Sequence, residues 1–125
     1  MLKRITLNLA RTPEYPEGSI RHGYDIIAPV NSEGYLDINE FNEKKDHCRV
    51  RRFWGDEAPR YGRLERRAGG VGGATWEIDY DDRSDDDDEA GYRLGDHKFA
   101  LDEYISIRDD EGELNTFQVV RIQDA

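Results

Sequence analysis

Residues 95–122 read GDHKFALDEYISIRDDEGELNTFQVVRI, and this stretch decides the fold class. Two runs rich in β-branched and aromatic residues, 104–108 and 116–122, flank an acidic turn that contains Gly112. Short apolar-alternating runs separated by a few residues with a glycine are typical of a β-hairpin. We therefore predict a hairpin that closes the chain, with Ile105 and Ile107 facing the core.

The return strand of this hairpin changes its apolar face partway along. Phe117 and Val119 share one face, whereas Val120 and Ile122 share the other. This change predicts either a bulge near residues 119–120 or a strand covered on both sides. A strand covered on both sides would lie centrally or at an interface, so the hairpin is also the best sequence-level candidate for a docking surface.

The rest of the chain repeats the same pattern of short strands and polar turns. Gly23 interrupts one run and predicts a bulge there. The predicted strands are 2–9, 19–30, 47–54, 62–68, 74–80 and the two strands of the hairpin, and 92–94 and 97–101 are short strand candidates. Together they predict a mostly β fold: a small antiparallel barrel or sandwich of about seven to eight short strands.

One short helix is predicted after the second strand. Asp37 can cap its first turn, Glu40 can complete a capping box, and Leu36 with Phe41 fits a hydrophobic staple. The length of 125 residues predicts a single domain, 1–125. The glycine loop 69–73 (GGVGG) is expected to be a flexible hairpin loop, since it lacks the Lys-Ser/Thr of a phosphate-binding loop.

Charge and cysteine content limit the class of protein. The net charge is −10, and Cys48 is the single cysteine, so an internal disulfide is excluded. Residues 1–43 have four basic and seven acidic side chains, 44–67 have nine and four, and 68–125 have five and seventeen. With no leader or membrane span in the pattern, we expect a cytoplasmic protein without a membrane partner.

The acidic loop 81–91 belongs to a run, 79–89, with eight carboxylates in eleven positions. Hard cations prefer such oxygen ligands, so this run is a candidate for a cation site. The register of a calcium loop places a required glycine at Ala90, which argues against it. We expect a solvated loop and no cofactor. The weak metal candidates are Asp85, Asp87, Glu89 and Asp96.

The basic segment interleaves arginine with aromatic residues, as nucleic-acid-binding barrels do. In a strand, however, Arg49 and Arg51 share one face while Val50 and Arg52 share the other. We therefore favour ion pairing with the acidic C-terminal half, within the chain or between subunits, and regard nucleic acid as a less favoured partner. The candidate interaction patch is Arg49, Arg51, Arg52, Trp54, Arg63, Arg66 and Arg67.

Catalytic signatures are missing from the sequence. His47 and Cys48 are neighbours, but adjacent strand residues point to opposite faces, which disfavours a nucleophile–base pair. His22, His47 and His97 are widely spaced, and only the fold could bring them together. The expectation leans against an enzyme, and no catalytic residue is assigned.

Three functions are therefore ranked. The first is a non-enzymatic β domain that binds a protein partner or itself, with a homodimer as one form. The second is a small nucleic-acid-binding barrel that uses the segment 49–67. The third is a barrel that binds a ligand in a tyrosine- and histidine-lined pocket, or a cation.

Overall fold

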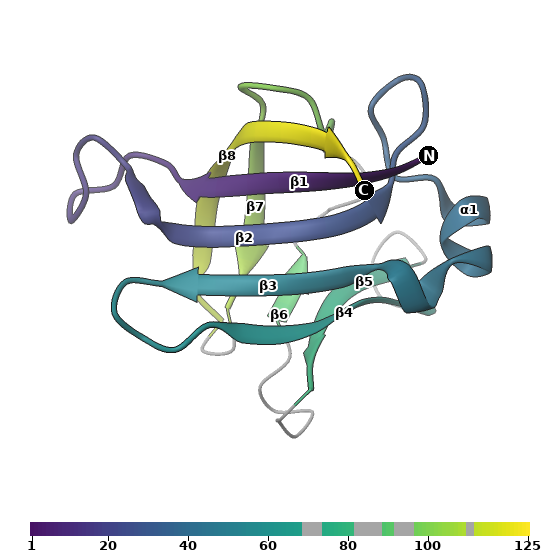
Figure 1. Ribbon diagram of the computed structural model, residues 1–125. Helices are drawn as coiled ribbons and strands as arrows, with labels where there is room; N and C mark the ends of the chain where they lie inside the picture. Colours follow the sequence, from purple (N-terminus) through teal and green to yellow (C-terminus); the bar gives the residue numbers. More distant parts are fainter. Residues whose placement is uncertain (69–73, 82–88, 92–96, 110–111) are drawn as a thin grey trace.

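The computed structural model describes residues 1–68, 74–81, 89–91, 97–109 and 112–125. It confirms the predicted mostly β antiparallel fold with a short helix, α1, and the described residues also contain a 3-10 turn, η1 (Figure 1). The elements are β1 Leu2–Leu9, β2 Ser19–Pro29, α1 Ile38–Glu43, η1 Lys45–His47, β3 Arg49–Trp54, β4 Arg60–Ala68, β5 Ala74–Tyr80, β6 Glu89–Gly91, β7 Tyr104–Arg108 and β8 Leu114–Asp124.

The strands form one curled sheet in which each strand pairs with the next. β8 also pairs with β1, so the ring of strand pairings closes into a barrel. The joint between β6 and β7 is the weakest, with the single residue pair Ala90–Arg108. Because the pairings close on themselves, the sheet leaves fewer free strand edges than an open sheet of this size.

The closing hairpin has the predicted form. Ile105 and Ile107 on β7 are 0% and 1% exposed. The turn is fixed by Asp109, whose carboxylate accepts a hydrogen bond from the Glu113 N–H at 2.8 Å. Gly112 has φ +84°, a conformation that favours glycine.

A bulge explains the change of face on β8. Thr6 lies opposite Arg121 but Leu7 lies opposite Val119, so Val120 is the extra residue. Val120 is 42% exposed, whereas Val119 is fully buried. Ile122 beyond the bulge packs against the core again. The bulge prediction is confirmed, and within the described part of this single chain the outer face of β8 at Val120 is not covered.

The predicted bulge at Gly23 is also present. Asn8 lies opposite Gly23, but Leu9 lies opposite Ser19, so β2 carries extra residues at this point. A side-chain Cβ at Gly23 would lie 1.8 Å from the Leu7 carbonyl oxygen. Only glycine fits there, because the two backbones approach closely.

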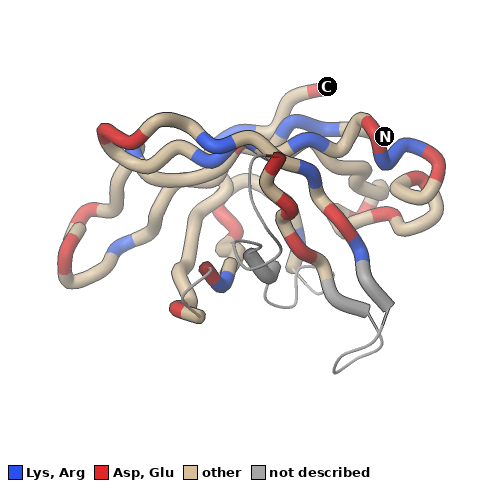
Figure 2. Tube along the Cα trace, turned by 90° about the horizontal axis from the view of Figure 1, so that it is seen from below, with Lys and Arg blue, Asp and Glu red and all other residues tan. Residues whose placement is uncertain are grey.

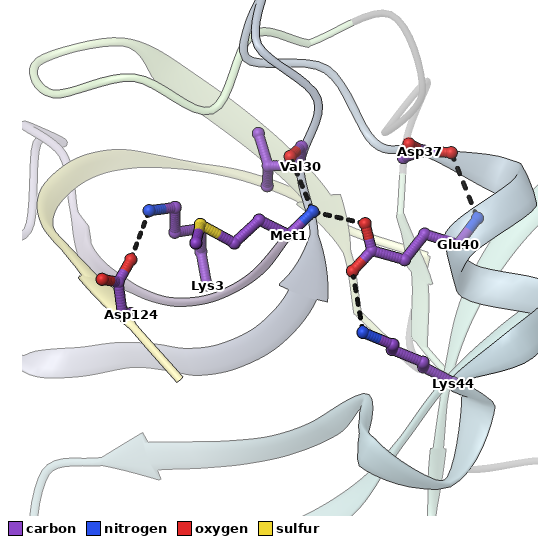
Figure 3. A network of polar contacts seen from close by, with 7 residues as sticks. All are labelled: Met1, Lys3, Val30, Asp37, Glu40, Lys44 and Asp124. Carbon is purple, nitrogen blue, oxygen red and sulfur yellow. Dashed lines mark hydrogen bonds and ion pairs between the residues drawn. The ribbon is translucent and has the colours of Figure 1, made fainter.

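The helix begins as predicted at the Asp37 cap. The Asp37 carboxylate accepts a hydrogen bond from the Glu40 N–H at 3.1 Å. The Glu40 carboxylate does not complete a capping box: it bonds the Met1 amino group and lies 3.5 Å from the Lys44 ammonium (Figure 3). The hydrogen bond from the Met1 amino group lowers the pKa of Glu40.

Several predicted boundaries are wrong. His47 belongs to η1 and β3 starts at Arg49, while β4 starts at Arg60, two residues before Gly62. Residues 97–101 are not a strand; Phe99 is 3% exposed and its N–H donates to the Gly34 carbonyl at 2.7 Å. Part of the predicted acidic loop is β6. Residues 69–73 and 92–94 lie outside the described residues.

Apolar side chains fill the inside of the barrel. The buried set includes Ile5, Leu7, Tyr24, Ile26, Ala28, Val50, Leu64, Trp76, Ile78, Tyr80, Ile105, Ile107, Phe117 and Val119. An eight-stranded barrel is narrow enough for side chains to fill its interior. Among the described residues, neither helical segment has the length and apolar character needed to cross a membrane.

Candidate anion-binding site at one end of the barrel

The fold divides the predicted arginine patch between the two faces of the sheet. Arg49, Arg51 and Arg63 lie on the outer face, where their side chains are 42–49% exposed. Arg52 and Trp54 lie on the inner face, at one end of the barrel. Arg66 is exposed and pairs across the sheet with Trp76, and the Arg67 side chain lies outside the described residues.

The outer arginines are held by carboxylates of the same chain. Arg51 Nη1 lies 3.0 Å from Asp25 Oδ2, and Arg63 Nε lies 3.6 Å from Glu65 Oε1. Arg49 pairs with Asp81, the one described partner of the three that comes from the acidic segment 68–125. Basic and acidic residues are interspersed along the strands (Figure 2). Exposed pairs of this kind contribute about 0–1 kcal/mol each.

The inner face carries a second pair of arginines. Arg52 on β3 and Arg60 on β4 are direct cross-strand partners. The Arg52 guanidinium carbon lies 4.3 Å from the centre of the Trp54 ring, and that of Arg60 lies 3.8 Å from the centre of the Tyr80 ring. Each guanidinium therefore covers an aromatic face, an arrangement that stabilises the charge.

The Arg60 side chain is incompletely satisfied. Its Nε and Nη2 atoms are buried and, within the described part of the chain, have no hydrogen-bond acceptor. Buried donors almost always have a partner, and leaving one without costs about 1–3 kcal/mol. Two like charges directly opposite each other are also unfavourable. An acceptor with negative charge would relieve both effects.

His22 extends this cluster toward the loop between β1 and β2. Its Nδ1 lies 2.6 Å from Ser19 Oγ and its Nε2 lies 3.3 Å from Tyr15 Oη, while its ring meets Trp54 edge-on at 4.8 Å. Burial, followed by the charges of Arg21 and Arg52, lowers the pKa of His22. Each ring nitrogen of His22 thus lies within hydrogen-bonding distance of a hydroxyl group.

We name the group formed by Tyr15, Ser19, His22, Arg52, Trp54, Arg60 and Tyr80 the arginine end. It lies where β2 and β4 begin and β3 and β5 end, next to the β1–β2 and β3–β4 loops at the left of Figure 1. Ser19 and His22 lack the carboxylate of a catalytic triad, because no acid among the described residues bonds to His22. Guanidinium groups such as those of Arg52 and Arg60 are able to bind carboxylate and phosphate groups.

The other nucleophile candidate is buried at the opposite end. Cys48 is fully buried, and its Sγ lies 3.5 Å from the Lys44 carbonyl oxygen. Burial, with a smaller effect from Glu40, raises the pKa of the thiol to about 11. A protonated, inaccessible thiol is not a nucleophile.

The histidines and carboxylates do not converge into a metal site among the described residues. His22 lies at the arginine end, His47 lies in η1 and His97 lies in the segment before Phe99. Of the four weak metal candidates, Asp85, Asp87 and Asp96 lie outside the described residues, as does the side chain of Glu89.

The interior holds side chains where a ligand-binding barrel would have its cavity. A pocket of about 180 Å³ lies near the helix, between Phe41, η1 and β4. This is smaller than the roughly 300 Å³ or more of typical small-molecule sites. This pocket is too small for a drug-sized ligand.

Sequence reasoning identified part of the arginine end. Arg52 and Trp54 were in the predicted patch, but Tyr15, Ser19, Arg60 and Tyr80 were not. The alternation of Trp76, Ile78 and Tyr80 gave the inward face of β5 correctly. If the predicted strand 62–68 had begun two residues earlier, Arg60 would have been placed on its inward face, because Arg60, Gly62 and Leu64 share that face.

The chain matches no protein-family model, no curated protein and no solved structure.

Proposed function

We propose that this chain is a non-catalytic β-barrel binding domain that holds a carboxylate or phosphate group at the arginine end. The observation that carries the proposal is Arg60, whose buried Nε and Nη2 donors have no acceptor among the described residues. These two nitrogens form the edge of the guanidinium that binds carboxylate and phosphate with two parallel hydrogen bonds.

The Nε and Nη2 atoms of Arg60 have to become accessible before an anion can bind them. Its side chain is partly exposed, although the two nitrogens are covered. We infer that the guanidinium turns its Nε–Nη2 edge toward solvent when an anion binds, while it stays over the Tyr80 ring. An arriving anion would replace missing hydrogen bonds, so binding gains energy that is not offset by losing existing ones.

The net negative charge of the chain opposes unspecific attraction of anions. A net charge of −10 repels anions in general, so weak attraction to any basic surface is not expected. The outer arginines already face carboxylates, which also weakens the support for the nucleic-acid alternative. That alternative stays testable by mixing with oligonucleotides at low salt, where electrostatic affinity is greatest.

The test is a calorimetric titration with inorganic phosphate and with acetate, at constant ionic strength. The wild-type chain should give saturable binding of at least one of them. Arg60→Met should abolish it, because methionine keeps much of the apolar length but donates no hydrogen bond. Arg63→Met is the matched control, since Arg63 lies on the same strand but on the outer face, and should bind as the wild type does.

Two results would overturn the proposal. One is the absence of saturable heat with both anions in the wild-type chain. The other is equal loss of binding in the Arg60 and Arg63 variants, which would indicate general charge attraction. A circular dichroism melt of each variant shows that the compared proteins are folded.

A further inference from the structure

His22 is a buried histidine of the arginine end that is contacted from β2, from β3 and from the neighbouring loop. It is 8% exposed. The hydroxyl groups of Tyr15 in the β1–β2 loop and of Ser19 on β2 lie beside its Nε2 and Nδ1 atoms. The Trp54 ring meets it edge-on, and a Cβ added at Gly55 would lie 3.3 Å from Nε2. The ring is therefore enclosed, with a hydroxyl partner at each nitrogen.

Both protonation states of His22 have hydrogen-bond partners in this arrangement. The neutral ring has one donor and one acceptor, whereas the protonated ring has two donors. A hydroxyl group can donate a hydrogen bond or accept one, so the hydroxyl that donates to the neutral ring can turn and accept from the protonated ring. Protonation therefore leaves neither ring nitrogen without a partner. The surrounding charges and the burial of the ring decide which state prevails.

The charges around His22 oppose its protonation. Burial has the largest effect and lowers the pKa of His22, and the positive charges of Arg21 on β2 and Arg52 on β3 lower it further. Glu57 in the β3–β4 loop acts in the opposite direction with a smaller effect. Arg21 also forms an ion pair with Asp56 of that loop. Together these groups make the ring harder to protonate than a histidine in water.

The proposed anion site lies close enough to change this balance. Trp54 is the cross-strand partner of His22, Arg52 shares its inner face on β3, and Arg60 on β4 is the cross-strand partner of Arg52. Neighbouring strands lie about 4.8 Å apart, so β4 is roughly 10 Å across the sheet from β2. This is about the Debye length in 0.1 M salt, and partly buried charges are screened less than exposed ones. A negative charge bound at Arg60 therefore makes His22 easier to protonate.

We propose that His22 couples anion binding at the arginine end to pH. Protonation of its imidazole adds a positive charge near the anion, so binding becomes tighter as the pH falls. By reciprocity, a bound anion makes the ring take up a proton. Two unit charges roughly 10 Å apart change the dissociation constant about threefold with full salt screening and about fifteenfold without it. This regulation rests on the anion site proposed above.

The test is a calorimetric titration of the whole chain with sulfate and with formate, at pH 8 and at pH 5.5 and constant ionic strength. Both ions keep their charge over this range, whereas phosphate does not. The wild-type dissociation constant for the ion that binds should be about three- to fifteenfold lower at pH 5.5. His22→Gln should lose most of this difference, because glutamine forms hydrogen bonds but does not titrate. His47→Gln is the matched control, since His47 is exposed in η1 near the helix, and it should keep the wild-type pH dependence.

A second measurement uses the wild-type chain alone. In a nuclear magnetic resonance titration of the imidazole signals, saturating anion should raise the pKa of His22 and leave the titration of His47 in place. Wild-type binding that does not change with pH overturns the coupling and leaves the anion site standing. A pH dependence that persists in folded His22→Gln does the same. The absence of saturable binding of both ions at both pH values removes the anion site and the coupling with it.

Discussion

The two ends of the barrel differ in how their charged side chains are partnered. At the helix end, Phe41 packs edge-on against Trp76 at 4.9 Å, and the charged Glu40 meets both the Met1 amino group and Lys44. At the arginine end, two cationic side chains point inward onto aromatic rings, and Arg60 leaves buried donors without acceptors. Among the described residues, the helix end also has a buried acceptor without a hydrogen bond, Glu40 Oε2, whereas at the arginine end the atoms without partners belong to a cationic side chain. Local departures from complete polar satisfaction are expected where a protein binds something.

The largest loss of stability should come from removing a buried aromatic side chain at the helix end. Trp76 is 5% exposed under Phe41, so Trp76→Ala should lower the free energy of unfolding by about 3–5 kcal/mol. Trp54→Ala at the arginine end should cost clearly less, because Trp54 is only partly buried. Urea denaturation of both variants measures the difference. Equal losses would show that the two ends are packed alike.

A smaller loss is expected at the start of α1. Asp37→Ala removes the acceptor of the Glu40 N–H and should lower the free energy of unfolding by about 1 kcal/mol. Asp37→Asn keeps an acceptor at the same position and should recover most of the loss. Chemical denaturation of the two variants checks this, and identical losses would show that the side-chain cap is not the stabilising contact.

At the arginine end, we predict a substitution that does not lower the free energy of unfolding. In buffer without added anions, Arg60→Met should leave the free energy of unfolding unchanged or raise it by about 1 kcal/mol, because an unsatisfied buried charge is replaced by an apolar side chain. The same variant should lose anion binding. A clear destabilisation by Arg60→Met would show that the arginine supports the fold rather than a ligand.

The smallest effect concerns pH. Because the folded state lowers the pKa of His22 from 6.5, the unfolded chain binds more protons below about pH 6.5. His22 should therefore contribute a loss of stability as pH falls through 6.5, and no difference well above it. Melting temperatures of wild type and His22→Gln between pH 8 and pH 5 check this. The glutamine variant should show a smaller decline, and an equal or steeper decline contradicts the assignment.

Much of the fold follows from the local pattern. The alternation in the closing hairpin predicted which side chains face the core. The change of apolar face near Val120 and the glycine at position 23 predicted the two bulges. These features are predictable because a bulge or a close backbone approach is specified by the residues at that point. The Asp37 cap is predictable for the same reason, because it depends only on residues of its own segment.

Other features depend on contacts between distant segments. Phe99 resembles a strand residue, but it is buried in a loop that is bonded to Gly34. The Glu40 carboxylate is taken by the distant Met1 amino group instead of the helix cap. The arginine end requires four strands in register to bring His22, Arg52, Arg60 and Tyr80 together, and no single segment specifies that register.

The most direct test of the central claim observes the Arg60 side chain itself. In a spectrum of arginine Nε–Hε groups, titration with the anion that binds in calorimetry should shift the Arg60 resonance in a saturable way. The Arg63 resonance should stay in place. A titration in which Arg60 does not move, or in which every arginine moves in parallel without saturation, would contradict a specific anion site at the arginine end.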